Sequence, residues 1–392
     1  MKQMKEEFMK QKKAIDIETF VVLFVIIGGF TALGSIMGVG NLFNTIMNTA
    51  HDLLLNTVFF IMAISVVTGA LSNVMAEFGV ISLLNKLISP LMRPVYGLPG
   101  AASLGILSTF VSDNPAILTL AKTDSFTKYF KPYQIPALCN LGTSFGMGMI
   151  LVTYMMGLGG DDIISAALIG VLGACIGSVV SVRLMMSKTK KYYNISKEES
   201  KADHSRKADR TTGEEMRTVH GSVMERVLNA ILEGGKTGVQ LGLDIIPGVL
   251  CICTFVMILT FGAPADGIYT GAAYEGIGLL PKLGDLIAPV TGILFGFKDP
   301  SNIAFPITSL GATGAAMALV PRMLETGAAG MNEIAVFTAM GMCWSGYLST
   351  HISMMDALDR RQFIKDAIVS HTIGGLCAGV AAHYIFMLFS LI

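Results

Sequence analysis

The sequence predicts an all-α polytopic membrane protein made of two inverted-topology repeats, each with a broken re-entrant hairpin. Three observations support this fold class. Of the 392 residues, 52% are hydrophobic and only 14% are charged, whereas a soluble domain has roughly 25% charged residues. Long apolar segments recur along the whole chain. The basic residues that flank these segments give the two halves opposite starting sides.

The apolar segments divide into clean spans and interrupted ones. A helix needs about 20 apolar residues to cross a hydrocarbon core of about 30 Å. The clean spans are Ile17–Met37, Leu53–Phe78, Gln134–Gly157, Ile163–Met186, Thr237–Gly262, Asn332–Thr350 and Ala367–Leu391. Val80–Lys122 and Leu283–Arg322 are interrupted by Gly, Pro, Ser and Asn, so we predict that each is a hairpin entering and leaving from one side.

Basic residues set the predicted orientation, because loops rich in Lys and Arg stay on the cytoplasmic side. The N-terminal lysines and the polar segment Ser187–Lys236 are placed inside, and Ala263–Gly278, which has no Lys or Arg, is placed outside. The predicted location is the cell membrane, a bacterial inner or plasma membrane, with the N-terminus and the central linker in the cytoplasm. The predicted units are 1–40 (N-terminal segment and first membrane helix), 41–186 (first repeat), 187–224 (polar linker) and 225–392 (second repeat).

Short sequence echoes accompany the two halves. Leu87–Pro90 opens the first hairpin and Leu286–Pro289 opens the second. Asn48 and Asp52 precede the helix of the first half with the same spacing that Asn229 and Glu233 show in the second. Small residues at helical spacing indicate close helix packing. The clearest such sets are Gly142, Gly146, Gly148 and Gly170, Gly173, Gly177.

The first hairpin contains the first set of candidate binding residues, Ser112, Asp113 and Asn114, followed by Pro115. An ionisable group inside an apolar stretch is costly in lipid and indicates a functional site. Asp113 could instead cap a helix that starts at Pro115, and a helix start can itself bind an anion.

The second hairpin repeats an acid beside a proline in Lys298, Asp299, Pro300, Ser301 and Asn302. These residues are either a binding site or a turn at the outer surface, where Lys298 could reach the interface.

Two further polar residues lie in clean spans. Asp244 is a charged residue one turn after Gln240, and Asn140 is an amide early in its helix. Asn140 suits a hydrogen bond between helices as well as it suits a binding site.

Several classes of function are disfavoured by the sequence. A net charge of zero gives no basic field for nucleic acid. Phosphate-loop, HExxH and GxSxG patterns are missing, so we expect neither an ATP-driven pump nor a hydrolase, and no enzyme activity. The six cysteines lie in apolar stretches without a CxxC pair, so we expect no metal site and no disulfide framework.

Two stretches resemble a known family. The segment from Asn229 to Val239 (NAILEGGKTGV) is similar to the opening of the Gate domain, or nucleoside recognition domain. The segment from Gly79 to Pro94 resembles the middle of the same domain. Gate domains occur in concentrative nucleoside transporters, ferrous-iron permeases and paired spore maturation membrane proteins. The resemblance covers about residues 45–180 and 225–390, and implies a membrane protein that moves a small solute. The family name implies a nucleoside.

These observations predict a secondary transporter or permease for a small polar or charged solute. Broken hairpins of an inverted repeat usually meet at a binding site near the midplane, so Ser112, Asp113 and Asn114 are expected to face Lys298, Asp299, Ser301 and Asn302. No cofactor is expected beyond a coupling Na⁺ or H⁺. The expected partners are the lipid bilayer, the solute and, through Gly-rich helix faces, other copies of the chain. A non-transporting membrane scaffold and an ion or metal channel remain the alternatives.

Overall fold

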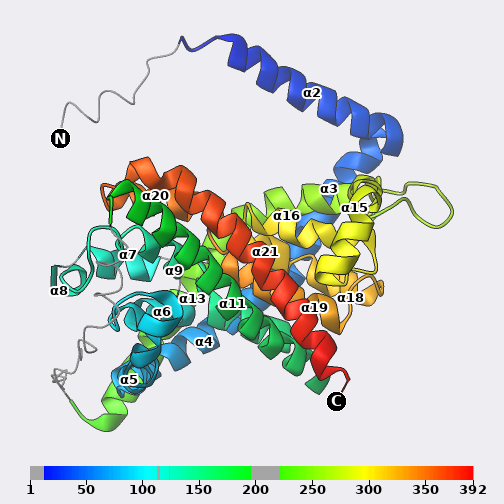
Figure 1. The fold of residues 1–392 in the computed structure, drawn as a ribbon. Coiled ribbons are helices and arrows are strands. Elements are labelled where there is room, and N and C mark those ends of the chain that lie inside the picture. The colour runs from blue at the N-terminus through cyan, green and yellow to red at the C-terminus, as the bar shows by residue number, and fades with distance from the viewer. Residues whose placement is uncertain (1–12, 113–114, 123, 196–220, 392) are drawn as a thin grey trace.

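The computed structural model describes residues 13–112, 115–122, 124–195 and 221–391, and these residues form helices joined by turns (Figure 1). Six of the helical segments are long and apolar enough to cross a membrane, and one bent helix pair adds a seventh. The bent pair turns by 79° between Phe295 and Pro300, as expected for a re-entrant element. The predicted all-α polytopic fold is therefore confirmed.

The first half runs through two long spans that enclose a set of short helices. Its elements are α2 (Ile17–Met37), α3 (Val39–Asp52), η1 (Leu53–Val58), α4 (Phe59–Glu77), α5 (Val80–Leu91), η2 (Met92–Tyr96), α6 (Ala102–Val111), α7 (Pro115–Ala121), α8 (Asp124–Thr127), α9 (Ala137–Thr143), α10 (Gly148–Met156) and α11 (Asp161–Tyr192).

The second half has the same order of long spans, hairpin and broken helix. Its elements are α13 (Val223–Pro247), η3 (Gly248–Cys253), α14 (Thr254–Thr260), α15 (Leu279–Phe295), η4 (Pro300–Ile303), α16 (Ala304–Ser309), α17 (Thr313–Met317), α18 (Val320–Glu325), α19 (Met331–Cys343), α20 (Tyr347–Ala357), η5 (Arg361–Phe363) and α21 (Ile364–Phe389).

Long helices of the two halves cross each other, and they do so antiparallel. At the crossing of α4 with α13, Gly69 lies against Gly234 and Ser65 against Gly238, so the contacts run in opposite directions along the chain. At the crossing of α11 with α21, Gly173 lies against Ala382 and Gly177 against Gly374. Antiparallel packing of equivalent helices is what a two-fold axis in the membrane plane produces.

Glycines make both crossings close enough for backbones to touch. A Cβ added at Gly173 would lie 2.7 Å from the carbonyl oxygen of Ala378, and one at Gly170 would lie 2.7 Å from that of Ala335 in α19. A Cβ at Gly234 would overlap the backbone of Gly69. The predicted packing role of Gly170, Gly173 and Gly177 is confirmed, because small residues let helices approach within backbone contact.

The repeats share local irregularities as well as their order. The long helix 39–77 contains the π-helical segment η1, and 223–260 contains η3, and the two segments pack together. Pro90 lies inside α5 and Pro289 inside α15. Met147 and Gly346 both adopt the left-handed backbone conformation. The distance along the chain between them is the same as that between Pro90 and Pro289. The echo of Leu87–Pro90 in Leu286–Pro289 therefore falls at equivalent positions.

Three details differ from the expectation. The span predicted from Leu53 begins already at Val39. The segments Gln134–Gly157 and Asn332–Thr350 are each broken in the middle, because turns at 144–147 and 344–346 interrupt them. With the spacing set by Pro90 and Pro289, the equivalent of Asn48 is Pro247, so the echo between Asn48 and Asn229 does not mark equivalent positions.

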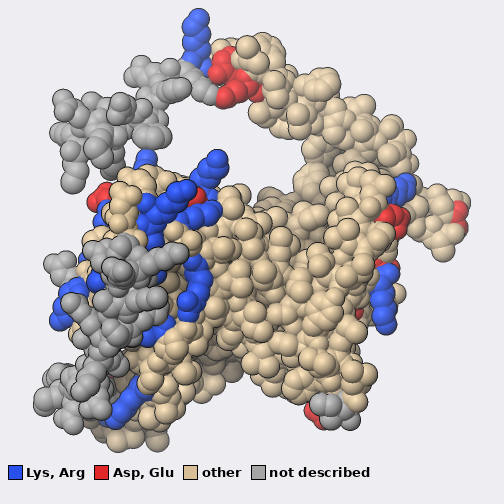
Figure 2. Space-filling view, in the orientation of Figure 1, with Lys and Arg blue, Asp and Glu red and all other residues tan. Residues whose placement is uncertain are grey.

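Charged side chains gather at the two ends of the molecule. Figure 2 shows blue Lys and Arg atoms at the end that carries α5 to α9 and α20, and an almost uncharged band between this end and the opposite one. Exposed basic residues at the first end include Lys86, Lys122, Lys128, Lys131 and Lys191. An uncharged band between two charged ends is the surface of a protein whose waist lies in lipid.

Helix α2 departs from the body of the molecule and packs mainly against α3 (Figure 1). Its side chains are apolar on all sides, and only 11% of its apolar window is buried. A helix that is hydrophobic all round and not buried in protein is suited to lipid. It begins at a capping box, in which Asp16 accepts from the N–H groups of Glu18 and Thr19.

Candidate functional site

Two helix breaks lie at the centre of the candidate site. The first break, residues 144–147, separates α9 from α10, and the second, 344–346, separates α19 from α20. Met147 at the end of the first break has φ of 53°, which is uncommon for a residue with a side chain, and Gly346 at the end of the second has φ of 66°. Non-helical backbone at membrane depth is tolerated only where protein or water satisfies its polar groups.

Both hairpins reach these breaks. A Cβ at Gly148 would overlap the ring of Phe110 from α6 and lie 3.0 Å from Sδ of Met342, just before the second break. A Cβ at Gly341 would lie 3.1 Å from the ring of Phe305 in α16 and 3.2 Å from Leu151 in α10. The two broken helices therefore cross each other, with one hairpin arm against each.

The tip of the second hairpin lies between α16 and α17, at Leu310–Ala312. Thr313 donates a hydrogen bond to the carbonyl of Gly341 at 3.2 Å, and the Tyr154 hydroxyl of α10 donates to the carbonyl of Met317 at 3.1 Å. These bonds fix the second hairpin to both broken helices. At the spacing of the repeats, Leu310–Ala312 and Thr313 are the equivalents of the first hairpin around Ser112–Asn114.

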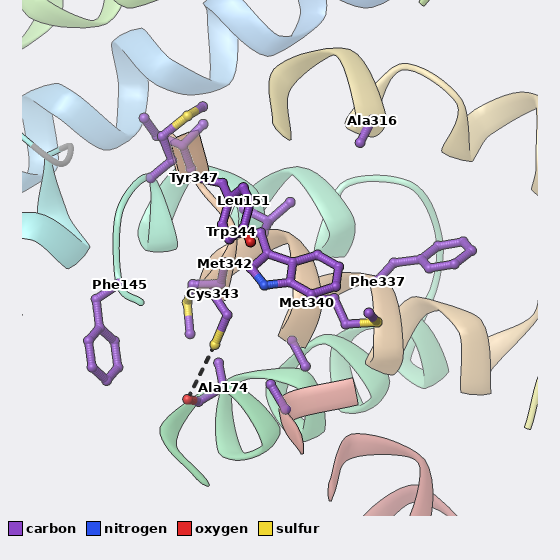
Figure 3. Close-up of a cluster of buried hydrophobic side chains, with 14 of the residues drawn as sticks. Phe145, Leu151, Ala174, Ala316, Phe337, Met340, Met342, Cys343, Trp344 and Tyr347 are labelled. Carbon is purple, nitrogen blue, oxygen red and sulfur yellow. Dashed lines mark hydrogen bonds between the residues drawn. The ribbon is translucent and has the colours of Figure 1, made fainter. Parts of the chain in front are cut away.

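Apolar side chains surround the second break. Figure 3 shows Trp344 and Tyr347 beside Met340 and Met342, with Leu151 from α10 close by. The Cys343 thiol lies 3.6 Å from the carbonyl oxygen of Ala174 in α11. The helices on either side of the breaks contain no Lys or Arg. Their acidic residues, Glu333 and Asp356, lie at the ends far from the breaks. The breaks therefore combine an apolar wall with uncharged polar groups.

A buried chain of polar side chains joins α9, α11 and α21, below the first break. The amide of Asn140 donates to Oγ of Ser181 at 3.0 Å and to the carbonyl of Ala367 at 3.0 Å. Oγ of Ser181 lies 2.9 Å from Nδ1 of His371, whose Nε2 contacts the carbonyl of Cys343. Asn140 and His371 are fully buried and Ser181 is almost so. We call these residues the Asn140–His371 chain.

Some buried acceptors in this region have no hydrogen-bond partner in the described part of the chain. They are Oδ1 of Asn140, Nε2 of His351 and Oγ of Ser370. An unsatisfied buried polar group costs about 1–3 kcal/mol. Asn140 lies in the helix that leads into the first break, and His351 lies in the helix that follows the second.

The residues predicted on the first hairpin are only partly described. Ser112 lies at the end of α6, where its hydroxyl donates to the carbonyl of Ser108 at 2.6 Å. Asp113 and Asn114 lie outside the described residues. Their predicted role at the tip stays a prediction.

The residues predicted on the second hairpin lie together, but at its base. Asp299 caps η4 by accepting from the N–H of Ser301 at 2.8 Å, as a helix start before Pro300 requires. Asn302 is fully buried and donates to the carbonyl of Ala328 at 3.0 Å, while its Oδ1 has no partner among the described residues. Lys298 is exposed. These residues therefore lie at the bend after α15 and not at the tip of the second hairpin.

The two remaining predicted residues have different surroundings. Asp244 lies on an exposed face of α13 and accepts from Nε2 of Gln240 at 2.8 Å, which confirms only that the two are one turn apart. Asn140 lies in the Asn140–His371 chain, away from the base of the second hairpin. The structure thus places the described members of the predicted set in separate polar groups.

Sequence reasoning missed Ser181, His371, His351 and the tip around Thr313. Ser and Thr are common in membrane helices, and a single His near a helix end is usually an interfacial residue. The sequence holds one signal for the correct position of the second tip. If Pro90 is aligned with Pro289, the repeat spacing predicts this tip near Ala312 and not at Asp299. Among the described residues, no group of three His, Cys, Asp or Glu side chains is placed to hold a metal ion.

A comparison with models of protein families and one with curated proteins both find no match. Solved structures do match. A variant of CNTnw with one substitution, in an intermediate state, aligns with a TM-score of 0.53 at 16% identity, covering 95% of this chain and 93% of that one. An outward-facing variant of CNTnw with two substitutions gives 0.53 at 16% identity, covering 94% and 85%.

CNTnw in an inward-facing, substrate-bound state gives a TM-score of 0.51 at 18% identity, covering 97% of this chain and 94% of the other. CNTnw is a concentrative nucleoside transporter. The alignment extends over both repeats, although fewer than one residue in five is identical. This chain therefore has the fold of the concentrative nucleoside transporters.

Proposed function

We propose that the protein is a secondary transporter for a small polar solute, which binds where the two broken helices meet the two hairpins. The observation that carries this proposal is the convergence of both helix breaks on each other, with Phe110 and Phe305 of the hairpins against them. Substrate sites of inverted-repeat transporters lie at discontinuous helices near the midplane. The shared fold with nucleoside transporters supports the same interpretation.

The lining favours a solute that is held by hydrogen bonds and apolar contact. Uncharged backbone and side chains line the breaks, and the side-chain amide oxygen of Asn140 has no donor among the described residues. A nucleoside, with an apolar base face and several hydroxyl donors, has this chemistry. Nucleosides are therefore the first solutes to test, and other small polar solutes come second.

The predicted residues have proposed roles in this scheme. Asp113 and Asn114, with Ser112, would lie at the tip of the first hairpin and bind the solute or a coupling Na⁺ or H⁺. Asp299, Ser301, Asn302 and Lys298 would act at the outer entrance, because they lie at the base of the second hairpin. Alternating access would move the repeats against each other, with the glycine crossings of α4 with α13 and of α11 with α21 as the surfaces that guide the motion.

The test is uptake by the purified chain in proteoliposomes. Radiolabelled nucleosides and a panel of other polar solutes are offered under an inward Na⁺ gradient, an inward H⁺ gradient or no gradient. We expect saturable uptake of at least one solute. Asp113→Asn and Asn140→Ala should each reduce uptake at least tenfold.

The control is Glu233→Gln on the exposed face of α13, where the carboxylate pairs only with Lys236 at 2.6 Å among the described residues. This variant should transport like the parent chain. Folded protein that moves none of the solutes under any gradient would contradict the transporter proposal. Normal uptake by folded Asp113→Asn and Asn140→Ala would contradict the site while leaving the activity in place.

A further inference from the structure

Two buried histidines lie side by side at the inner end of the candidate site. The rings of His351 in α20 and His371 in α21 have centroids 4.6 Å apart. Both side chains are fully buried. Tyr347 stacks on His371 at 6.1 Å and lies 6.0 Å from His351. Two imidazoles in contact within an uncharged helix bundle are not needed for packing alone, since an apolar side chain fills the same volume without polar atoms.

Hydrogen-bond directions fix the protonation of His371. Its Nε2 contacts the carbonyl of Cys343, and a carbonyl oxygen can only accept, so Nε2 carries the proton. In the neutral ring Nδ1 is then an acceptor, and the Ser181 hydroxyl donates to it at 2.9 Å. The amide of Asn140 donates in turn to Ser181. Both nitrogens of His371 are thus engaged.

The same reasoning leaves His351 with a free acceptor. Its Nδ1 contacts the carbonyl of Tyr347, so Nδ1 carries the proton and Nε2 has a bare lone pair. That Nε2 is buried and has no hydrogen-bond partner in the described ranges. Of the unpartnered acceptors in this region, Nε2 of His351 is the strongest base, because an imidazole nitrogen binds a proton more readily than an amide or hydroxyl oxygen.

The charges around the pair neither supply nor compensate that proton. Among the described residues of the packed elements, α9 and α11 contribute the uncharged Asn140 and Ser181, and α19 contributes the backbone carbonyl of Cys343. Residues 115–121 of α7, which packs against α20, contain no charged type. Asp366 of α21 pairs with Lys188 at 3.3 Å, and Asp356 of α20 pairs with Arg361.

We propose that Nε2 of His351 is a proton-binding site, and that the proton it takes up is the ion that drives transport; the second clause rests on the proposed function. A proton from water forms an N–H bond at Nε2, and the ring carries a single positive charge. The neighbouring His371 then stays neutral, because two charged rings in contact repel each other. A charged ring is costly in the closed, dry state. Proton binding therefore favours a conformation in which α20 is open to water, which is how a bound ion shifts a conformational equilibrium.

A built-in reporter allows proton binding to be measured without any transport. Trp344 is the single tryptophan of the chain, and its Nε1 donates to the carbonyl of His371 at 3.3 Å. A protonated imidazole quenches the fluorescence of a nearby indole. In lipid nanodiscs, the emission of the full chain should fall along a single sigmoid as the pH is lowered from about 8 to about 3, below the range of an exposed imidazole because the ring is buried.

Variants assign that transition to one ring. His351→Asn keeps a donor for the carbonyl of Tyr347 but cannot titrate, so the sigmoid should disappear while the circular dichroism spectrum is unchanged. His351→Gln is the second variant, should Asn fail to fold. His383→Gln is the matched control, because His383 bonds to Asn332 at 2.7 Å in another polar group, and it should keep the sigmoid. A flat titration of the parent chain, or a sigmoid that persists in folded His351→Asn, overturns the site and leaves a neutral polar pocket only.

The coupling clause has its own readout. In proteoliposomes, His351→Asn should retain solute exchange at equal pH on both sides but lose at least tenfold of the accumulation driven by an H⁺ gradient. A merely structural role would reduce both. If accumulation by the parent chain does not depend on the H⁺ gradient, the claim that this proton drives transport is overturned, even if the fluorescence transition is present. Absence of any solute movement with an intact fluorescence transition would instead contradict the transporter proposal and leave the proton site standing.

Discussion

Most buried polar side chains in the described residues have a hydrogen-bond partner, and the few that have none are informative. Glu275 in the loop between α14 and α15 is an example of full satisfaction. Its carboxylate accepts from the N–H and the hydroxyl of Thr270, at 3.0 and 2.6 Å, and from the N–H of Gly271 at 2.9 Å. Burial opposes its ionisation, but these hydrogen bonds outweigh burial and lower the pKa of the Glu275 carboxyl. By contrast, Asn140 and His351 each retain a buried acceptor without a partner in the described residues.

Glu275→Gln should reduce the thermal stability of the chain at neutral pH, by about 1–3 kcal/mol, because an amide supplies one acceptor where the carboxylate supplies two. A lowered pKa in the folded state stabilises the fold above the usual glutamate pKa, and this stabilisation is lost as the pH falls through the lowered value. The difference in melting temperature between parent and variant should therefore shrink at acidic pH. A difference that grows on acidification would contradict the account, and Glu233→Gln, which removes an exposed ion pair, should change little.

Helices in this protein are held by close backbone contacts and shaped by breaks. The crossing of α4 with α13 depends on Gly234 and Gly238, whose missing Cβ atoms leave room for Gly69 and Ser65. Breaks in α9/α10 and α19/α20 expose backbone polar groups in the membrane interior, which would be costly in lipid and are shielded by the hairpin arms. Unbroken helices thus form the close crossings, and the broken helices form the proposed solute site.

Gly234→Ala should destabilise the chain by about 1–3 kcal/mol, because the added methyl group overlaps the backbone of Gly69. Gly235→Ala is a sharp control at the adjacent position, where the nearest atom to an added Cβ is a methyl group of Val66 at 3.6 Å. Thermal unfolding in detergent measures both. Equal melting temperatures for the two variants would show that the crossing is looser than the structure describes.

At the scale of the whole molecule, the two repeats are related by antiparallel crossings of long helices. The contact of Gly177 with Gly374 lies near the pseudo-two-fold axis, and most of the Lys and Arg side chains in Figure 2 lie at the end that carries α5 to α9 and α20. The proposed topology places that end in the cytoplasm, by the positive-inside tendency.

Cysteine labelling tests this topology. In a background with the exposed Cys251 replaced by Ser, a membrane-impermeant maleimide should label Asp266→Cys in intact cells and label Lys191→Cys only after permeabilisation. Both positions are exposed, Asp266 in the loop between α14 and α15 and Lys191 at the end of α11. Labelling of both residues from the same side would contradict the crossing order, and an exchange of the two results would invert the proposed orientation.

The sequence by itself determined the membrane fold, six of the seven predicted clean spans and the repeat, because apolar length, basic flanks and the prolines at 90 and 289 are local properties of the chain. It also located Asn140 as a polar residue inside a helix. Only the tertiary structure decided that two of the spans are broken, at Met147 and Gly346, beside the contacts with both hairpins. It moved the second hairpin tip away from Asp299, and it brought His351 and His371 together from helices separated by a turn. Such contacts between distant residues depend on which helix faces meet. A run of apolar residues predicts a helix but does not specify which of its faces contacts which neighbour.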